Sequence, residues 1–244
     1  MSGPRVHEFE GLLIHQSTDQ PVNSAPRPVP GPPHRWAVRF AIEGDLRFLS
    51  HHDCMRLMER LVVRAGLALR YSQGFNPHPV LSMPLPRPVG VATRDDLLVL
   101  ALEGPVDAQD VLDRLSRQAP RGLRFLSAAP MAPGKAPRPA RAFYELLLSP
   151  VEEEALRPRL AELESQADWT VRRTTVGSRG KQTVSRPIDL RPLVEHIEIR
   201  ECVLRFTLRR QTDAWARPAE LLGWLGLEGP QAAARVVRTG AEYE

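Results

Sequence analysis

The chain has 244 residues, a formal net charge of +4 at pH 7 and 42% hydrophobic residues, enough for one large or two small domains with their own cores. Its two cysteines are too few for a disulfide framework, and no apolar run has the length of a membrane span or the pattern of a secretion signal. Composition therefore excludes a disulfide-rich scaffold and a helical membrane protein, and we expect a cytoplasmic globular protein without a membrane partner.

The first 35 residues differ from the rest of the chain. Their second half is crowded with prolines and shows no apolar period, and these prolines are Pro21, Pro26, Pro28, Pro30, Pro32 and Pro33. Such a composition is typical of a disordered or extended leader. We therefore predict a leader over residues 1–35 and folded domains over residues 36–130 and 142–244, joined by a linker over residues 131–141.

Strand, helix and loop signals follow one another at the start of the folded part. Residues 36–42 alternate apolar side chains with small or basic ones, which is the period of a half-buried strand. Ser50, with an acid three residues later, has the pattern of a capping box, and Gly66 is a suitable end for the helix. A second strand is predicted over residues 67–71. The loop over residues 72–79 mixes donors, acceptors, an aromatic ring and stiffening prolines, which is typical of a contact surface.

The remaining elements repeat the same order. They are predicted strands over residues 98–102 and 123–126 around a helix from Asp107, and strands over residues 143–148, 169–175, 202–209 and 235–238 with helices from Ser149 and Pro218. The order βαββαβ thus occurs twice, and it is the order of the ferredoxin-like fold, in which helices cover one face of an antiparallel sheet. We predict an α+β protein of two tandem ferredoxin-like domains. The other face of each sheet is then either open for binding or covered by loops or by the other domain.

Several segments of the chain resemble one bacterial family. They are Gly44–His51, Asp53, Arg56, Tyr71–Pro79, Asp189–Leu193 and Arg238–Gly240. With these segments the chain resembles, from Trp36 to Tyr243, the radical-SAM-linked proteins, a family of uncharacterised function. In that family the domain either follows a radical SAM module in one chain or stands as a separate protein. The resemblance implies a radical SAM enzyme as the partner, and it implies no activity.

Acid-free stretches that are rich in arginine indicate a polyanionic partner. They span residues 61–94, 114–144 and 169–188, and arginine makes forked contacts with phosphate groups. The alternative is a compositional bias or an ordinary solvated face. The side chains that we expect to contact RNA or a partner protein are Arg47, His51, Arg56, Tyr71, Ser72, Gln73, Gly74, Phe75, Asn76, His78, Arg172, Arg173, Lys181 and Arg191.

Motifs for cofactors and metals are lacking in the sequence. There is no phosphate-binding P-loop, no dinucleotide fingerprint after a strand and no nucleophile elbow. Cys54 and Cys202 cannot supply the clustered thiolates that hold a radical SAM iron–sulfur cluster. His51 and His52 are adjacent, so they point in different directions on a helix and are poorly placed to share a metal ion. We therefore expect no cofactor and no metal.

Three functions are consistent with the sequence. We prefer a non-catalytic accessory protein that presents a substrate to a separate radical SAM enzyme and contacts RNA. The second is a metal-independent endoribonuclease resembling the repeat-processing nucleases of CRISPR systems. In that hypothesis His51 is the general base and Tyr71 or His78 its helper, whereas the alternative for His51 is a structural hydrogen bond to the following loop. The third is a protein adaptor that binds no nucleic acid.

Overall fold

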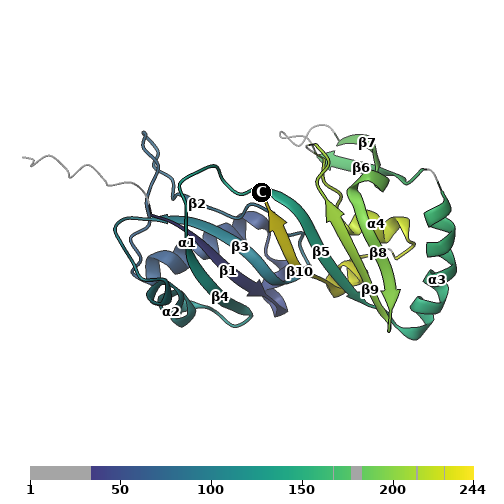
Figure 1. Cartoon of the computed structure of the whole chain (residues 1–244), viewed down its shortest axis with the longest axis horizontal. Coiled ribbons are helices and arrows are strands. Elements are labelled where there is room, and N and C mark those ends of the chain that lie inside the picture. The colour runs from purple at the N-terminus through teal and green to yellow at the C-terminus, as the bar shows by residue number, and fades with distance from the viewer. Residues whose placement is uncertain (1–33, 167, 177–182, 213, 228) are drawn as a thin grey trace, which may run out of the picture. The chain divides into compact units, whose positions relative to one another are not determined.

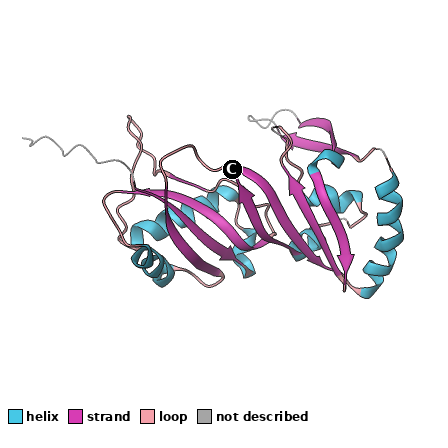
Figure 2. Ribbon diagram, in the orientation of Figure 1, coloured by secondary structure: helices cyan, strands magenta, loops and turns pink. Residues whose placement is uncertain are grey.

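The structure is a computed structural model that describes residues 34–166, 168–176, 183–212, 214–227 and 229–244. It is a mixed α+β fold with few helices, built on a mostly antiparallel sheet of eight strands (Figures 1 and 2). Residues 1–33 of the predicted leader lie outside the described residues. The last two residues of that leader belong to the first strand, which begins at His34.

The longest connection between the described elements is the one from α1 to β2, which contains residues 65–80. The first half contains β1 (His34–Ile42), the 3-10 helix η1 (Gly44–Phe48), α1 (His51–Arg64), β2 (Leu81–Ser82), β3 (Ala92–Leu102), α2 (Ala108–Gln118) and β4 (Leu123–Met131). The second half contains β5 (Pro139–Leu147), α3 (Pro150–Ser165), β6 (Thr170–Val176), β7 (Thr183–Asp189), η2 (Arg191–Leu193), β8 (Val194–Arg200), β9 (Val203–Arg209), α4 (Pro218–Trp224), α5 (Pro230–Arg235) and β10 (Val236–Tyr243). The helix starts predicted at Ser50 and Ser149 are confirmed, because each hydroxyl accepts a hydrogen bond from the backbone N–H three residues later.

The last strand joins the two halves into one sheet. The strand order is β4-β1-β3-β10-β5-β9-β8, and the short β2 also pairs with β3. Neighbouring strands are antiparallel except for β3 and β10, which pair in parallel at Ala92 with Val237 and at Thr93 with Arg238. Figure 1 shows β10 between β3 and β5. The last strand, β10, must therefore be in place before the strands of the two halves form one continuous sheet.

Two hydrophobic clusters form the core. The first includes Phe40 and Leu98 of the sheet and Met58 of α1, and the second is built mainly from β5, β9, β10 and the helices of the second half. Leu85 and Val91, which precede β3, belong to this second cluster although they come from the first half. The core of the second half therefore includes side chains from the segment 84–91, which we call the seam segment.

Two predicted strands differ in the structure. Residues 67–71 form no strand; Leu69 and Tyr71 make only isolated bridges, to Leu102 and Pro79. The chain turns back on itself here, and the prolines of the following loop lack the N–H groups that a sheet ladder needs. The strand predicted over residues 169–175 is present as β6, but it pairs with β7 in a separate two-stranded sheet. Its expected place in the main sheet is taken by β8, an edge strand whose charged side chains conceal the period.

Ion pairs lie on the face of the sheet opposite to the buried side chains of β5. Glu145 accepts hydrogen bonds from Arg94 at 2.8 Å and from Arg205 at 3.1 Å. Arg141, on the same strand, donates to Glu195 at 2.8 Å. These arginines are engaged within the chain, so this face is less suited to binding phosphate than the sequence suggests.

Candidate functional site

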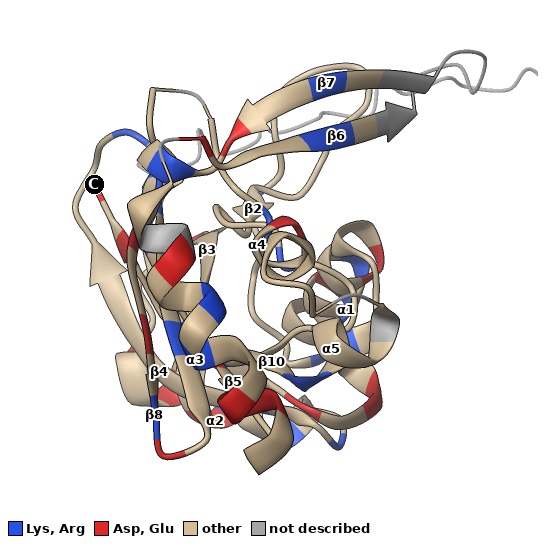
Figure 3. Ribbon diagram, turned by 90° about the vertical axis from the view of Figure 1, so that its right-hand side faces the viewer, with Lys and Arg blue, Asp and Glu red and all other residues tan. Residues whose placement is uncertain are grey.

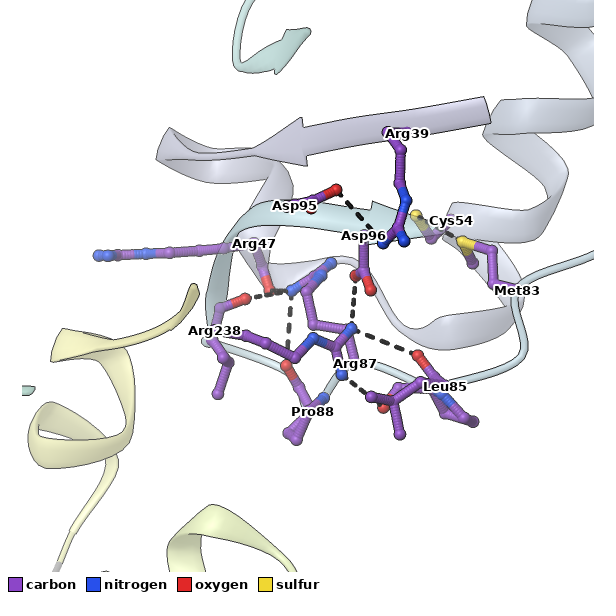
Figure 4. Close-up of polar contacts among 12 residues, drawn as sticks. Arg39, Arg47, Cys54, Met83, Leu85, Arg87, Pro88, Asp95, Asp96 and Arg238 are labelled. Atoms are coloured by element: carbon purple, nitrogen blue, oxygen red, sulfur yellow. Dashed lines mark hydrogen bonds and ion pairs between the residues drawn. The ribbon is translucent and has the colours of Figure 1, made fainter. Parts of the chain in front are cut away.

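A buried charged cluster lies where β3 and β10 run side by side (Figure 4). Arg238 of β10 has no exposed surface, and its guanidinium forms an ion pair with Asp96 of β3. The same group donates to the carbonyl of Leu85 at 3.3 Å. Burial works to lower the pKa of Arg238, but the Asp96 carboxylate together with Tyr144 and Tyr243 outweighs burial and the pKa is raised. The pair thus connects both halves of the sheet with the seam segment.

Arg87 brings a second guanidinium into the cluster. Its Nη1 donates to the carbonyls of Arg47 and Val91, both at 2.6 Å, and only 7% of the residue is exposed. In the described part of the chain this guanidinium has no hydrogen bond to a carboxylate, and burial lowers its pKa. Arg87, Arg238 and Asp96 together therefore leave a net positive charge under the sheet.

His51 and Cys54 of α1 face this cluster across a small pocket. The pocket has a volume of about 10 Å³ and is also lined by Met83, whose sulfur lies 4.0 Å from the sulfur of Cys54. Burial raises the pKa of the Cys54 thiol and lowers the pKa of His51, with His52 adding to the second effect. The thiol and the imidazole are therefore neutral near pH 7, and the thiol is a poor nucleophile.

The surroundings of His51 bear on both of the roles expected for it. Its Nδ1 is buried and has no hydrogen-bond partner among the described residues, so within them this atom does not make the predicted structural bond to the loop. Tyr71 and His78, the proposed catalytic helpers, do not line the pocket of His51. The structure thus does not bring the three catalytic candidates together around that pocket.

A larger cavity, which we call the seam cavity, opens beside the seam segment. Its volume is about 600 Å³. Its lining contains Arg87, Arg173, Arg210, Arg217, the rings of Tyr144 and Trp215, and five prolines, and no acidic residue lines it in the described part of the chain. The seam cavity and the His51 pocket share Leu85 and Arg87. Arg87 therefore belongs to both sites.

The segment Tyr71–Pro79, which we call the motif loop, projects from the first half. At its base Ser72 donates its backbone N–H to the carbonyl of His78 at 2.8 Å, and the Ser72 hydroxyl accepts from the His78 N–H at 2.9 Å. Phe75 between them is fully exposed, and Tyr71 is 41% exposed. The loop thus has a fixed base and an apolar tip in solvent.

Most of the arginines expected to contact a partner are engaged within the chain. Arg47 donates to the carbonyl of Ala234 at 2.8 Å. Arg191 donates to a carbonyl just before β6. Arg56 lies 3.6 Å from the Asp53 carboxylate on the exposed side of α1. Of these side chains, only that of Arg56 is held by nothing more than a surface ion pair.

The three residues of the β6–β7 region that we expected to contact RNA or a partner differ in their surroundings. Arg173 is buried and donates to Glu220 at 2.5 Å and to the carbonyl of Trp215 at 2.7 Å. Arg172 is exposed. Lys181 lies outside the described residues.

Neither a metal-binding cluster nor a membrane-spanning helix is present in the described ranges. They contain no group of His, Cys, Asp and Glu side chains placed to hold a metal ion. None of the helices in the described part of the chain is long and apolar enough to cross a membrane.

Sequence reasoning missed Arg87 and Asp96. Each is a charged residue inside an apolar stretch, Arg87 within a run of prolines and Asp96 at the start of the apolar part of β3. A charge in such a position is costly to bury unless it is paired. A charged residue within an apolar stretch was therefore the signal in the sequence that could have indicated a buried ion pair.

Comparison with known proteins gives a family. Residues 35–218 match the family described as uncharacterized protein conserved in bacteria (DUF2344), and the chain belongs to it. That description names neither an activity nor a partner. No curated protein matches the chain. Among solved structures, the crystal structure of an unknown protein from Galdieria sulphuraria is similar at 12% identity and a TM-score of 0.24, over 73% of this chain and 84% of that one.

Proposed function

We propose that this protein is a non-catalytic accessory protein that docks on a separate enzyme through the motif loop and presents a substrate to it. The observation that carries the proposal is the full exposure of Phe75 on a loop whose base is fixed by hydrogen bonds. Hydration of a large apolar side chain is unfavourable, and Tyr71 and Val80 at the base of the loop are also exposed. A fixed base lowers the entropic cost of binding.

The partner that we propose is a radical SAM enzyme. The motif loop belongs to the segments that resemble radical-SAM-linked proteins. Cys54 and Cys202 cannot hold the cluster of such an enzyme, so the iron–sulfur chemistry has to come from another polypeptide or module. Substrate presentation is then the contribution of this chain.

The surroundings of His51 favour this proposal over the endoribonuclease. A general base acts best when its pKa lies near the working pH, whereas burial lowers the pKa of His51. Neither Tyr71 nor His78 lines its pocket. The accessory role therefore fits the surroundings of His51 better than RNA cleavage.

RNA contact is part of the proposal and rests on the β6–β7 hairpin. Arg172 and Arg186 are exposed on it, and neither forms an ion pair within the described part of the chain. Figure 3 shows basic segments on both strands of this hairpin. Arg173 is not expected to contact RNA, because Glu220 already binds its guanidinium. Exposed arginines of this kind are suited to phosphate.

We also propose that each half is a ferredoxin-like unit. In the second half the order β10-β5-β9-β8, with α3 after β5 and α4 and α5 before β10, supports the assignment. In the first half the support is the order β4-β1-β3, with α1 after β1, α2 before β4 and the short β2 beside β3.

The docking proposal is tested with the full chain as bait and with a loop variant, Phe75→Ala with Asn76→Ala. The unaltered chain should enrich a radical SAM enzyme from a bacterial extract, with or without bound RNA, and the loop variant should lose it. Both replaced side chains are exposed, so the thermal midpoint should hardly change. Binding of the purified enzyme then gives the loss of affinity directly.

The matched control is Val151→Ala, which removes another exposed apolar side chain, 76% exposed on α3, and should leave binding intact. A loop variant that loses much of its stability but still binds would show that the motif loop is structural, and the docking proposal would be wrong.

A further inference from the structure

The seam cavity has the dimensions of a small-molecule site. At about 600 Å³ it lies within the usual range for ligand pockets, roughly 300–1,000 Å³. Its walls come from the seam segment of the first half and from residues of the second half around Trp215. Neither half can form it alone.

The charge of the lining is positive. Two of its arginines have carboxylate partners, since Arg173 contacts Glu220 at 2.5 Å and Arg210 contacts Glu244 at 2.7 Å. Arg87 donates to backbone carbonyl oxygens and makes a side-chain hydrogen bond with Cys54. Within the described ranges, neither Arg87 nor the exposed Arg217 side chain has a carboxylate at the distance of a salt bridge. Among these residues, Asp96 and Glu220 act on the guanidinium groups of Arg87 and Arg217 only through space, without a salt bridge, so both guanidiniums can still attract an anionic ligand.

The rest of the lining is apolar and flat. Trp215 is half-buried, Tyr144 is buried, and the prolines add rigid apolar surface without N–H donors. An indole ring beside guanidinium groups is the combination that binds a planar heterocycle through its face and a phosphate through its oxygens.

We propose that the seam cavity binds a nucleotide, with the base against Trp215 and the phosphate against Arg217 and Arg87. The nucleotide is either a free nucleoside monophosphate or one unit of an RNA strand, since the chemistry that recognises it is the same. This site is separate from the motif loop and does not depend on the docking proposal.

The test measures binding of the four nucleoside 5′-monophosphates to the full chain by calorimetry, with the uncharged nucleosides and inorganic phosphate as comparisons. A monophosphate should bind at least about tenfold more tightly than its nucleoside, because its phosphate makes charge-assisted hydrogen bonds. Arg217→Gln and Trp215→Ala should each weaken monophosphate binding by about tenfold. Arg217 is exposed, so Arg217→Gln should keep its fold. Trp215 packs against the second core, so the thermal midpoint of Trp215→Ala is measured beside its affinity, and the result for Arg217→Gln decides if Trp215→Ala is unstable.

The control is Arg124→Gln, which removes an exposed arginine of β4 outside the cavity and should leave nucleotide binding unchanged. A short single-stranded RNA that competes with the monophosphates and binds more tightly identifies a strand as the source; no competition identifies the free nucleotide. Three results would overturn the proposal. They are equal affinity for nucleoside and monophosphate, binding of inorganic phosphate as tight as that of the monophosphate, and unchanged affinity for the monophosphate in both variants. The loop variant should bind nucleotides normally, so failure of the docking proposal is seen separately.

Discussion

Arg238 and Asp96 show how a single pair of side chains can connect two halves of a chain. One residue is on the last strand and the other on β3, and both are almost entirely removed from water. A buried ion pair gains little over an apolar pair of the same shape, because both ions lose their hydration. Loss of one member is a different matter, since it leaves the other charge buried without compensation.

We predict that Asp96→Asn lowers the free energy of unfolding by about 3–5 kcal/mol, the usual effect of breaking a buried ion pair on one side. The Arg238 charge would then add to that of Arg87 with no carboxylate to offset it. Urea denaturation at neutral pH measures the change.

The double variant, Asp96→Asn with Arg238→Met, should be less destabilised than the sum of the two single variants, because neither charge is left alone. Asp110→Asn is the control, since it breaks an exposed ion pair with Arg114 at 2.8 Å and should change stability little. Additive effects in the double variant would mean that the two side chains contribute through packing only.

At the scale of single elements, α3 is held at its first turn. The Ser149 N–H and hydroxyl both donate to the Glu152 carboxylate, at 2.7 and 2.9 Å, and Arg235 of α5 donates to it at 2.6 Å. These bonds, with that from Arg235 the largest cause, lower the pKa of Glu152 from its ordinary 4.5 to about 2. The carboxylate thus joins the start of α3 to the end of α5.

A pH dependence follows from this shift. Because the pKa of Glu152 is lower in the folded chain than in the unfolded one, its contribution to stability is full above pH 4.5 and is lost as the pH falls toward about 2. Glu152→Gln should therefore destabilise the protein at neutral pH, and the difference from the unaltered chain should shrink through this acid range. Denaturation curves at several pH values test it; a difference that stays constant down to the lowest pH would contradict the assignment.

The elements that the sequence predicts well are those that carry their own period or cap. β1, β9 and the starts of α1 and α3 follow from alternation or from a capping serine, which are local signals. β8 was missed because an edge strand bears charged residues. Residues 67–71 do lie beside the end of β3, since Leu69 bridges Leu102 and the Arg70 N–H donates to the Ala101 carbonyl, but the pairing is too short to form a strand. The seam cavity could not be predicted, since its walls come from segments far apart in the chain.

At the scale of the whole described molecule, the two halves share both sheet and core. Only two residue pairs join β3 with β10, which by itself is a weak connection. The seam segment strengthens it, because Leu85 and Val91 are buried in the core of the second half while Arg87 binds η1 of the first through the Arg47 carbonyl. Two independently folding units would not exchange core side chains in this way.

We predict that the two halves unfold in one cooperative transition. Leu85→Ala, which removes a side chain that is 6% exposed in the second core, should lower the free energy of unfolding by about 2–5 kcal/mol. Hydrogen exchange in urea should show the same shift for β1 as for β9, because global opening limits exchange in both. Val111→Ala, in the first core, is the matched control and should also shift both strands together. A shift confined to β9 in the first variant, or to β1 in the second, would show that the halves fold as separate domains.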